Sequence, residues 1–237
     1  MHLFHQPDIS LSYLPEQESL HAIKVLRLQL GDEIVILDGA GGFHRAKIIS
    51  VHPKRCEYEL VESVYNFGQK SYNLHVAIAP TKNIDRLEWF IEKAVEIGID
   101  EITLLRCQFS ERKNVNFERL QKIIIAAAKQ SVKAYFPQLN PLCTFEEFIR
   151  QHAAQTESHT KLIAHCYQEG KQILKSAIDN KERILVLIGP EGDFSQKEIA
   201  LALAHEFIPV SLGNHRLRTE TAGVMACATA AIVLGEN

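Results

Sequence analysis

The sequence predicts a parallel α/β domain preceded by a small β-rich domain. From residue 72 onward, apolar strand-like segments alternate with helical patterns, and such alternation with short connections is typical of a parallel sheet. One of these segments, Ile184–Ile188, is apolar throughout, as expected for a strand buried on both faces. Residues 1–70 instead contain short strand candidates between glycine-rich turns, which favour a small β-barrel.

The amino-terminal region contains one helical pattern and three strand candidates. The helical pattern covers Leu20–Leu28 and ends before a turn at Gly31-Asp32. Short apolar and β-branched runs bounded by turn residues predict strands at Glu33–Leu37, Arg45–Val51 and Cys56–Val64. Residues 66–71 are mostly polar and include Gly68, so we expect a linker there and place the domains at 1–70 and 72–237.

The second domain is expected to alternate strands with helices. Its strands are predicted at Leu74–Ala79, Ile102–Leu105, Lys161–His165, Ile184–Ile188 and Ile208–Leu212. Apolar residues on one helical face and capping boxes predict helices that begin at Asp85, Asn116, Thr144 and Ser195. The last helix, Ala222–Leu234, is apolar on nearly every side, so we expect it to be buried in the core or between subunits.

Composition excludes several classes of protein. No apolar run approaches the roughly 20 residues that a membrane span needs, and residues 1–5 lack the pattern of a signal peptide. Five widely spaced cysteines without a CxxC pair predict reduced thiols in a cytoplasmic protein. Metal chemistry and serine hydrolysis are not expected, because the sequence has no HExxH motif, no His/Cys cluster at ligand spacing and no GxSxG motif.

A local excess of positive charge lies in the middle of the chain. The net charge is −3, but seven basic and two acidic residues occur between Arg106 and Lys133. Such an excess can attract nucleic-acid phosphates even on an acidic protein. A solvated helix face explains the same pattern equally well, so charge alone leaves both interpretations open.

Two strand–turn–helix units near the end of the chain predict a ligand site. Ile184–Ile188 leads into Gly189-Pro190-Glu191-Gly192, and Ile208–Leu212 leads into Gly213-Asn214. Open α/β sheets bind ligands at the carboxyl ends of their strands, where both turns would lie. Neither turn matches a dinucleotide or P-loop fingerprint, and Glu191 and Asp193 would repel a phosphate. One such turn alone would be structural, whereas two at adjacent positions favour a site for a cofactor without phosphate.

Arginines follow the second turn. Arg216 and Arg218 lie between that turn and a helix start, inside the expected crevice. A guanidinium there can stabilise negative charge that develops on a substrate, and we assign this role to Arg218. The function of Arg216 stays open, since paired surface charges often need none.

The two turn motifs resemble those of a known family. Gly189-Pro190-Glu191-Gly192 and Leu217-Arg218-Thr219-Glu220-Thr221-Ala222 are similar to motifs of the RsmE family of 16S ribosomal RNA (uracil-N(3))-methyltransferases, in the SPOUT superfamily. The resemblance covers the whole chain, including His21 with Val25–Leu28 and the basic middle. It implies a SPOUT-type, trefoil-knotted parallel sheet domain with a C-terminal knot, behind a PUA-like β-barrel domain that binds RNA. It also implies a homodimer.

The resemblance further implies roles for individual residues. S-adenosylmethionine would be held by three loops through Ala164, His165, Ile188, Gly189, Pro190, Glu191, Gly192, Leu212, Gly213, Leu217 and Thr221. Arg218 would stabilise a uracil anion, and Glu220 would orient that arginine or accept the proton, unless Glu220 is only a helix-start carboxylate. The RNA backbone would be held by Arg27, Arg112, Lys129 and Lys133.

Three positions depart from the family pattern. Asp193 stands where glycine is common, Lys129 where glutamate is common and Lys133 where arginine is common. The expected substrate is 16S rRNA or the assembled small ribosomal subunit. Two rival functions stay open: a catalytically silent RNA-binding ribosome-assembly factor with the same fold, and a small-molecule α/β enzyme that uses another nucleotide.

Overall fold

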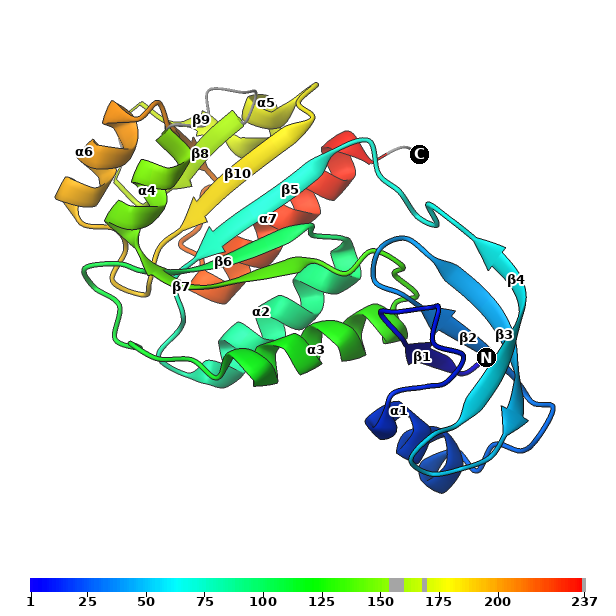
Figure 1. Cartoon of the computed structure of the whole chain (residues 1–237). Coiled ribbons are helices and arrows are strands. Elements are labelled where there is room, and N and C mark those ends of the chain that lie inside the picture. The colour runs from blue at the N-terminus through cyan, green and yellow to red at the C-terminus, as the bar shows by residue number, and fades with distance from the viewer. Residues whose placement is uncertain (154–159, 168–169, 236–237) are drawn as a thin grey trace. The chain divides into compact units, whose positions relative to one another are not determined.

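The computed structural model of the chain describes residues 1–153, 160–167 and 170–235. The chain packs as two compact units (Figure 1). Unit 1 comprises Met1–Gln69 and Ile125–Phe136, and unit 2 comprises Lys70–Ile124 and Pro137–Asn237. Within the described part of the chain, no helix has both the length and the apolar character needed to cross a membrane.

Unit 1 is built on a four-stranded sheet in the order β1-β2-β3-β4. Its strands are β1 (Leu3–His5), β2 (Glu33–Leu37), β3 (Phe43–Ser50) and β4 (Glu57–Val64). β1 runs parallel to β2, and the other neighbours are antiparallel. Leu14 N donates to Cys56 O at 2.9 Å and Tyr58 N donates to Ser12 O at 3.0 Å, so the segment that follows β1 bonds to β4. The predicted small β-rich domain is confirmed.

The helix of unit 1 begins earlier than predicted. Instead of Leu20–Leu28, the structure has α1 (Glu16–Leu20) followed by a π-helical turn, η1 (His21–Val25). Pro15 occupies the N-cap position with φ −52°, which the proline ring itself favours. The carboxylates of Glu16 and Glu18 then interact favourably with the helix dipole. This start is polar, so apolar spacing did not reveal it.

Unit 2 contains a parallel sheet in the order β7-β6-β5-β10-β8-β11-β9. Its strands are β5 (Asn73–Ile78), β6 (Glu101–Arg106), β7 (Gln138–Thr144), β8 (Thr160–Ala164), β9 (Gln172–Ile173), β10 (Arg183–Ile188) and β11 (Ile208–Ser211). The apolar run of β10 lies between β5 and β8, and none of Ile184–Ile188 is more than 2% exposed. The predicted parallel α/β sheet is confirmed, and the C-terminal knot stays a prediction.

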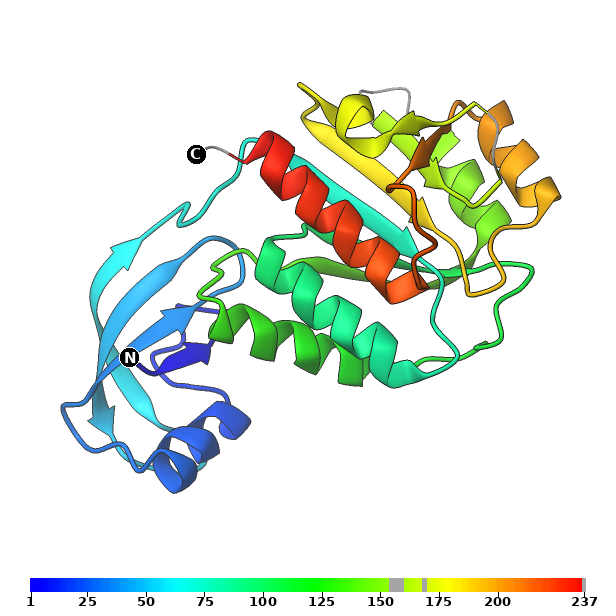
Figure 2. The same ribbon diagram turned by 180° about the vertical axis from the view of Figure 1, so that it is seen from behind.

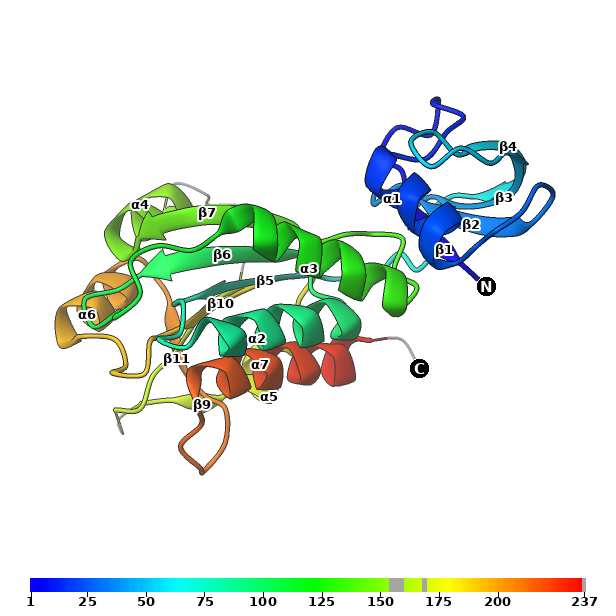
Figure 3. The same ribbon diagram turned by 90° about the horizontal axis from the view of Figure 1, so that it is seen from below.

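Helices cover both faces of this sheet. They are α2 (Ile84–Ile97), α4 (Phe145–Ala153), α5 (Leu174–Ile178), α6 (Gln196–Ala204) and α7 (Thr219–Leu234). Helix α3 (Phe117–Gln130) begins in unit 2, and its last six residues belong to unit 1. Figures 2 and 3 show α2, α5 and α7 against one face, and α4 and α6 against the other. Helix α7 begins three residues before the predicted Ala222, which places Glu220 and Thr221 in its first turn.

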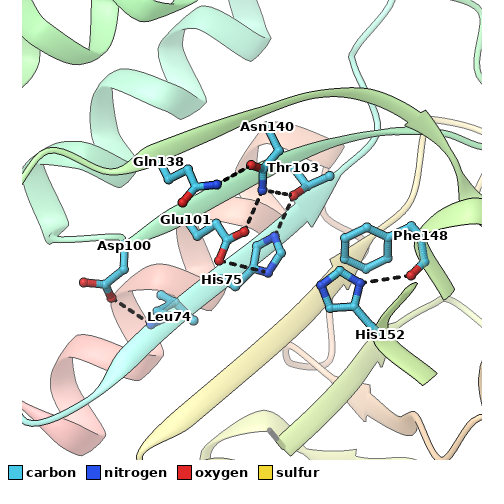
Figure 4. Close-up of polar contacts among 9 residues, drawn as sticks. All are labelled: Leu74, His75, Asp100, Glu101, Thr103, Gln138, Asn140, Phe148 and His152. Carbon is cyan, nitrogen blue, oxygen red and sulfur yellow. Dashed lines mark hydrogen bonds and ion pairs between the residues drawn. The ribbon is translucent and has the colours of Figure 1, made fainter. Parts of the chain in front are cut away.

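Strand β7 was not predicted, and its polar residues explain why. Asn140 Nδ2 donates to Glu101 Oε1 at 2.6 Å and to Thr103 Oγ1 at 2.8 Å, which fastens β7 to β6 (Figure 4). Thr103 Oγ1 also lies 2.7 Å from Nε2 of the buried His75 on β5. Pro141 is tolerated because β7 is an edge strand of this sheet. The short elements β9 and α5 were also not predicted.

Candidate cofactor site

A cavity of about 1080 Å³ lies at the carboxyl ends of β8, β10 and β11. Three stretches of chain form most of its wall: residues 164–167, 188–193 and 210–219. All the predicted cofactor-binding residues line it except Thr221. The volume is slightly above the roughly 300–1,000 Å³ usual for small-molecule sites, so an extended cofactor can be accommodated.

Close packing explains the glycines of the turn after β10. A Cβ at Gly189 would lie 3.1 Å from the ring of Phe194, which is fully buried, and 3.2 Å from the backbone nitrogen of Phe194. A Cβ at Gly192 would lie 3.0 Å from Cβ of Phe109. Side chains at either position would push the turn away from its neighbours, so the backbone itself faces the cavity.

Hydrogen bonds join the three stretches to one another. Thr219 Oγ1, which is buried, donates to the carbonyl oxygen of Gly189 at 3.0 Å and so joins the start of α7 to the turn after β10. Cys166 N donates to Asp193 Oδ2 at 2.8 Å, which joins the stretch after β8 to the same turn. Neither Thr219 nor Cys166 was predicted to belong to the site. Their polar contacts run between segments distant in sequence, so no local pattern signalled them.

His165 gives the cavity an unsatisfied polar group. Its Nδ1 is buried and has no hydrogen-bond partner among the described residues, although the side chain lines the cavity. Burial lowers the pKa of His165 below its ordinary value, the charge of Lys171 lowers it further, and Asp193 raises it. The imidazole that lines the cavity is therefore favoured in its neutral form, while its Nδ1 is buried beneath the cavity surface.

The two predicted catalytic residues occupy different places. Arg218 lines the cavity together with Arg216. Glu220 does not line it: the residue is 6% exposed, and its Oε1 lies 3.8 Å from Nε of Arg86 on α2. Its Oε2 is buried without a partner in the described structure. Sequence reasoning missed Arg86 as the charge partner of Glu220, because the two residues come from distant segments.

The predicted RNA-binding residues also differ in availability. Arg27 is exposed and has φ +57°, whereas Lys133 is half-buried. Lys129 Nζ lies 2.6 Å from Glu18 Oε1, and both side chains are largely buried. The guanidinium of Arg112 donates to the carbonyl oxygens of residues 81 and 82 at 3.0 and 2.6 Å. Arg27, Lys129 and Lys133 belong to unit 1, and Arg112 belongs to unit 2.

The fold and site together define a cofactor-binding α/β protein with a small accessory β domain. Among the described residues, no group of three or more His, Cys, Asp or Glu side chains is placed to hold a metal ion. Sequence profiles give the family: an RNA methyltransferase domain matches residues 68–231, and an RNA methyltransferase PUA domain matches residues 14–61. The chain belongs to this RNA methyltransferase family, the RsmE family that its motifs resemble.

Individual relatives agree with that assignment. Ribosomal RNA small subunit methyltransferase E of Rickettsia conorii is 30% identical over 91% of this chain and 87% of its own length. A crystal structure of a probable rRNA-methyltransferase from Porphyromonas gingivalis is 38% identical, with a TM-score of 0.91 over 99% of this chain and 98% of its own. The Neisseria gonorrhoeae ribosomal RNA small subunit methyltransferase E, bound to S-adenosyl methionine, is 26% identical, with a TM-score of 0.84 over 98% and 97%.

Proposed function

We propose that this protein uses S-adenosylmethionine to methylate N(3) of a uridine in the 16S RNA of the small ribosomal subunit. The observation that carries the proposal is the cavity at the carboxyl ends of β8, β10 and β11, lined by both glycine turns and by Arg218. The relatives from Rickettsia and Neisseria, named as small-subunit rRNA methyltransferases, support the substrate. The S-adenosyl methionine of the Neisseria structure supports the cofactor.

The residues of the cavity suit such a cofactor. Backbone groups of the turn after β10 supply hydrogen-bonding groups without a phosphate-binding motif. S-adenosylmethionine, when bound, supplies a methyl group made electrophilic by its sulfonium. The protein then has to align the attacking nitrogen and exclude water. The neutral state of His165 adds no positive charge that would oppose the sulfonium.

Arg218 is the proposed catalytic residue. The N(3) atom of uracil becomes a good nucleophile when its proton leaves, and the resulting negative charge spreads onto the ring oxygens. A guanidinium in the cavity wall stabilises that charge. Glu220, buried in the first turn of α7 and away from the cavity wall, is proposed to position the segment that carries Arg218 rather than to accept the proton, because its Oε2 is buried.

RNA binding is assigned to both domains, 1–70 and 72–237. Exposed Arg27 contributes from the first, and Arg112 from the second. Lys133 is retained as a contact to the RNA backbone, whereas Lys129 contributes charge only if its pair with Glu18 opens.

We also propose a homodimer through α7, whose apolar Met225 and Ile232 are 39% and 80% exposed. Action on rRNA would place the protein in the cytoplasm.

The decisive experiment is a methylation assay on small ribosomal subunits, and on free 16S RNA, from cells that lack the protein. We expect one N(3)-methyluridine in the subunit RNA after incubation with S-adenosylmethionine. Arg218→Ala should lower the single-turnover rate about 100-fold while calorimetry still detects the cofactor. Methylation of another atom would overturn the proposed specificity. Binding of RNA without any heat from S-adenosylmethionine would instead support the assembly-factor alternative.

A further inference from the structure

Asp193 has a backbone conformation that favours glycine. Its φ is +66°, in the left-handed region that non-glycine residues rarely adopt. Aspartate is one of the few side chains that tolerate this region, because its short carboxylate can bond to nearby backbone groups. An aspartate at such a position therefore suggests that its carboxylate makes contacts a glycine could not.

The carboxylate of Asp193 bonds to two different segments. Oδ1 accepts from Phe194 N at 2.8 Å, within its own turn, and Oδ2 accepts from Cys166 N at 2.8 Å, beyond the end of β8. The backbone nitrogen of Asp193 donates to Pro190 O at 2.9 Å and closes the turn. One carboxylate oxygen thus bonds within the turn after β10, and the other bonds to the segment that follows β8.

The bond to Cys166 lies where the sheet no longer holds the two walls together. The register of β8 with β10 ends at Ala164 and Ile188, and the chain on both sides then forms the cavity wall. Two residues past Ala164, the Asp193 carboxylate supplies the next bond between these walls. A cavity whose walls are already in place binds its ligand more tightly, because fewer of its conformations are unable to bind.

We propose that Asp193 is a positioning residue that joins the β8 and β10 walls of the cofactor cavity and thereby sets the affinity for S-adenosylmethionine. The inference rests on the cofactor of the proposed function. It differs from a direct role of Asp193 in ligand contact, because the residue acts through its bond to Cys166. The two roles predict different behaviour of the Cys166 amide before any cofactor is added.

The test compares Asp193→Gly and Asp193→Asn in the full chain. Hydrogen exchange at the Cys166 amide is measured without cofactor, and the Kd for S-adenosylmethionine is measured by calorimetry. Asp193→Gly relieves the strain of the positive φ but removes both carboxylate bonds. If the two walls are then correctly placed in only about a tenth of the molecules, the exchange rate of the Cys166 amide and the Kd for S-adenosylmethionine should each rise about tenfold. Asp193→Asn keeps one acceptor oxygen and should give intermediate values, and kcat at saturating cofactor should change less than twofold.

Glu206→Gly is the matched control. Glu206 also has φ +66°, but it lies in the turn after α6, and its side chain is 90% exposed. This substitution should leave both the Cys166 amide and the Kd unchanged. An unchanged Kd in Asp193→Gly overturns the proposal, and so does a raised Kd with normal exchange at Cys166, which indicates direct contact. A parent protein that gives no heat with S-adenosylmethionine contradicts the proposed function instead, whereas the exchange measurement needs no cofactor.

Discussion

Oε1 of Glu220 lies 3.8 Å from Nε of Arg86, and this pair joins the first turn of α7 to the first turn of α2. The second oxygen, Oε2, is buried and has no partner in the described structure. A buried carboxylate is costly unless a charge or donors compensate it, so the Arg86 guanidinium is an important partner. Because Arg218 precedes Glu220 by two residues, the pair also fixes the segment that holds Arg218 at the cavity.

Replacing Arg86 should therefore destabilise the protein more than an ordinary surface change does. We expect Arg86→Gln to lower the free energy of unfolding by about 1 kcal/mol, less than for a fully buried pair because Arg86 is partly exposed. Adding Glu220→Gln should recover part of the loss, since the uncompensated charge is then gone. Chemical denaturation measures both effects. Arg45→Gln, which breaks a pair with Glu62 in which both side chains are more than half exposed, is the control and should change little.

Stability should fall in mild acid because of His165. Burial, together with Lys171, holds the pKa of His165 below its ordinary value of 6.5, so the unfolded chain binds the proton more readily than the folded protein. This contribution to stability is complete above about pH 6.5 and is lost as the pH falls through the lower pKa of the folded state. Melting temperatures from pH 7.5 to 5.0 measure it.

The substitution His165→Asn should make that decline shallower. A residual decline is expected, because burial also lowers the pKa of His5 in unit 1. The same substitution at exposed His52 serves as the control for the effect of replacing a histidine by asparagine elsewhere in the chain. A profile for His165→Asn that overlays the parent would show that this histidine does not titrate differently in the two states.

Continuous apolar runs made the sheet of unit 2 predictable. Ile184–Ile188 was predicted as a buried strand, and β10 adds only Arg183 to it. Glycine turns were equally informative, because a residue type that is required for close packing stands out in one sequence. Polar edge elements were not predictable in this way: β7 depends on Asn140 meeting Glu101 and Thr103, and each of these contacts spans more than 35 residues.

In the candidate site, too, residues placed by local sequence pattern were predictable, and residues placed by distant partners were not. Residues in the glycine turns reach the cavity as expected, because they follow directly from strand ends. The environments of Glu220 and Lys129 depend on partners far away in the sequence, Arg86 and Glu18, and a charged residue carries no local sign of its partner. The helical start at Thr219 was missed for a related reason, since its hydroxyl bonds to Gly189 rather than capping α7.

Two basic residues of unit 1 should respond differently to charge reversal. Arg27→Glu should weaken RNA binding and make its salt dependence shallower, because Arg27 is exposed and free to meet phosphate. Lys129→Glu should mainly lower the melting temperature, because it places two carboxylates together where Lys129 now pairs with Glu18. Binding assays at several salt concentrations, with melting curves for each variant, separate the effects. Normal stability of Lys129→Glu would contradict the structural role of the pair.

A glycine-to-alanine change in α7 should destabilise the protein, against the usual trend for helices. Alanine is favoured over glycine within a helix by about 1 kcal/mol. At Gly223, however, a Cβ would lie 2.5 Å from Cε2 of Phe90 and 3.1 Å from Cδ1 of Ile78. Both of these side chains are fully buried, so neither can move aside without disturbing the core. Overpacking costs about 1–3 kcal/mol, and a contact as short as 2.5 Å places this change at the upper end of that range, above the gain in helix propensity.

We therefore expect Gly223→Ala to lower the free energy of unfolding by about 1 kcal/mol or more in denaturant titrations. Phe90→Leu alone should also destabilise the protein, because it removes buried atoms. In the double variant the smaller leucine makes room for the new methyl group, so the combined loss should be less than the sum of the two single losses. Strict additivity would mean that α7 shifts away from α2 instead, and the helix start next to Arg218 would then be displaced with it.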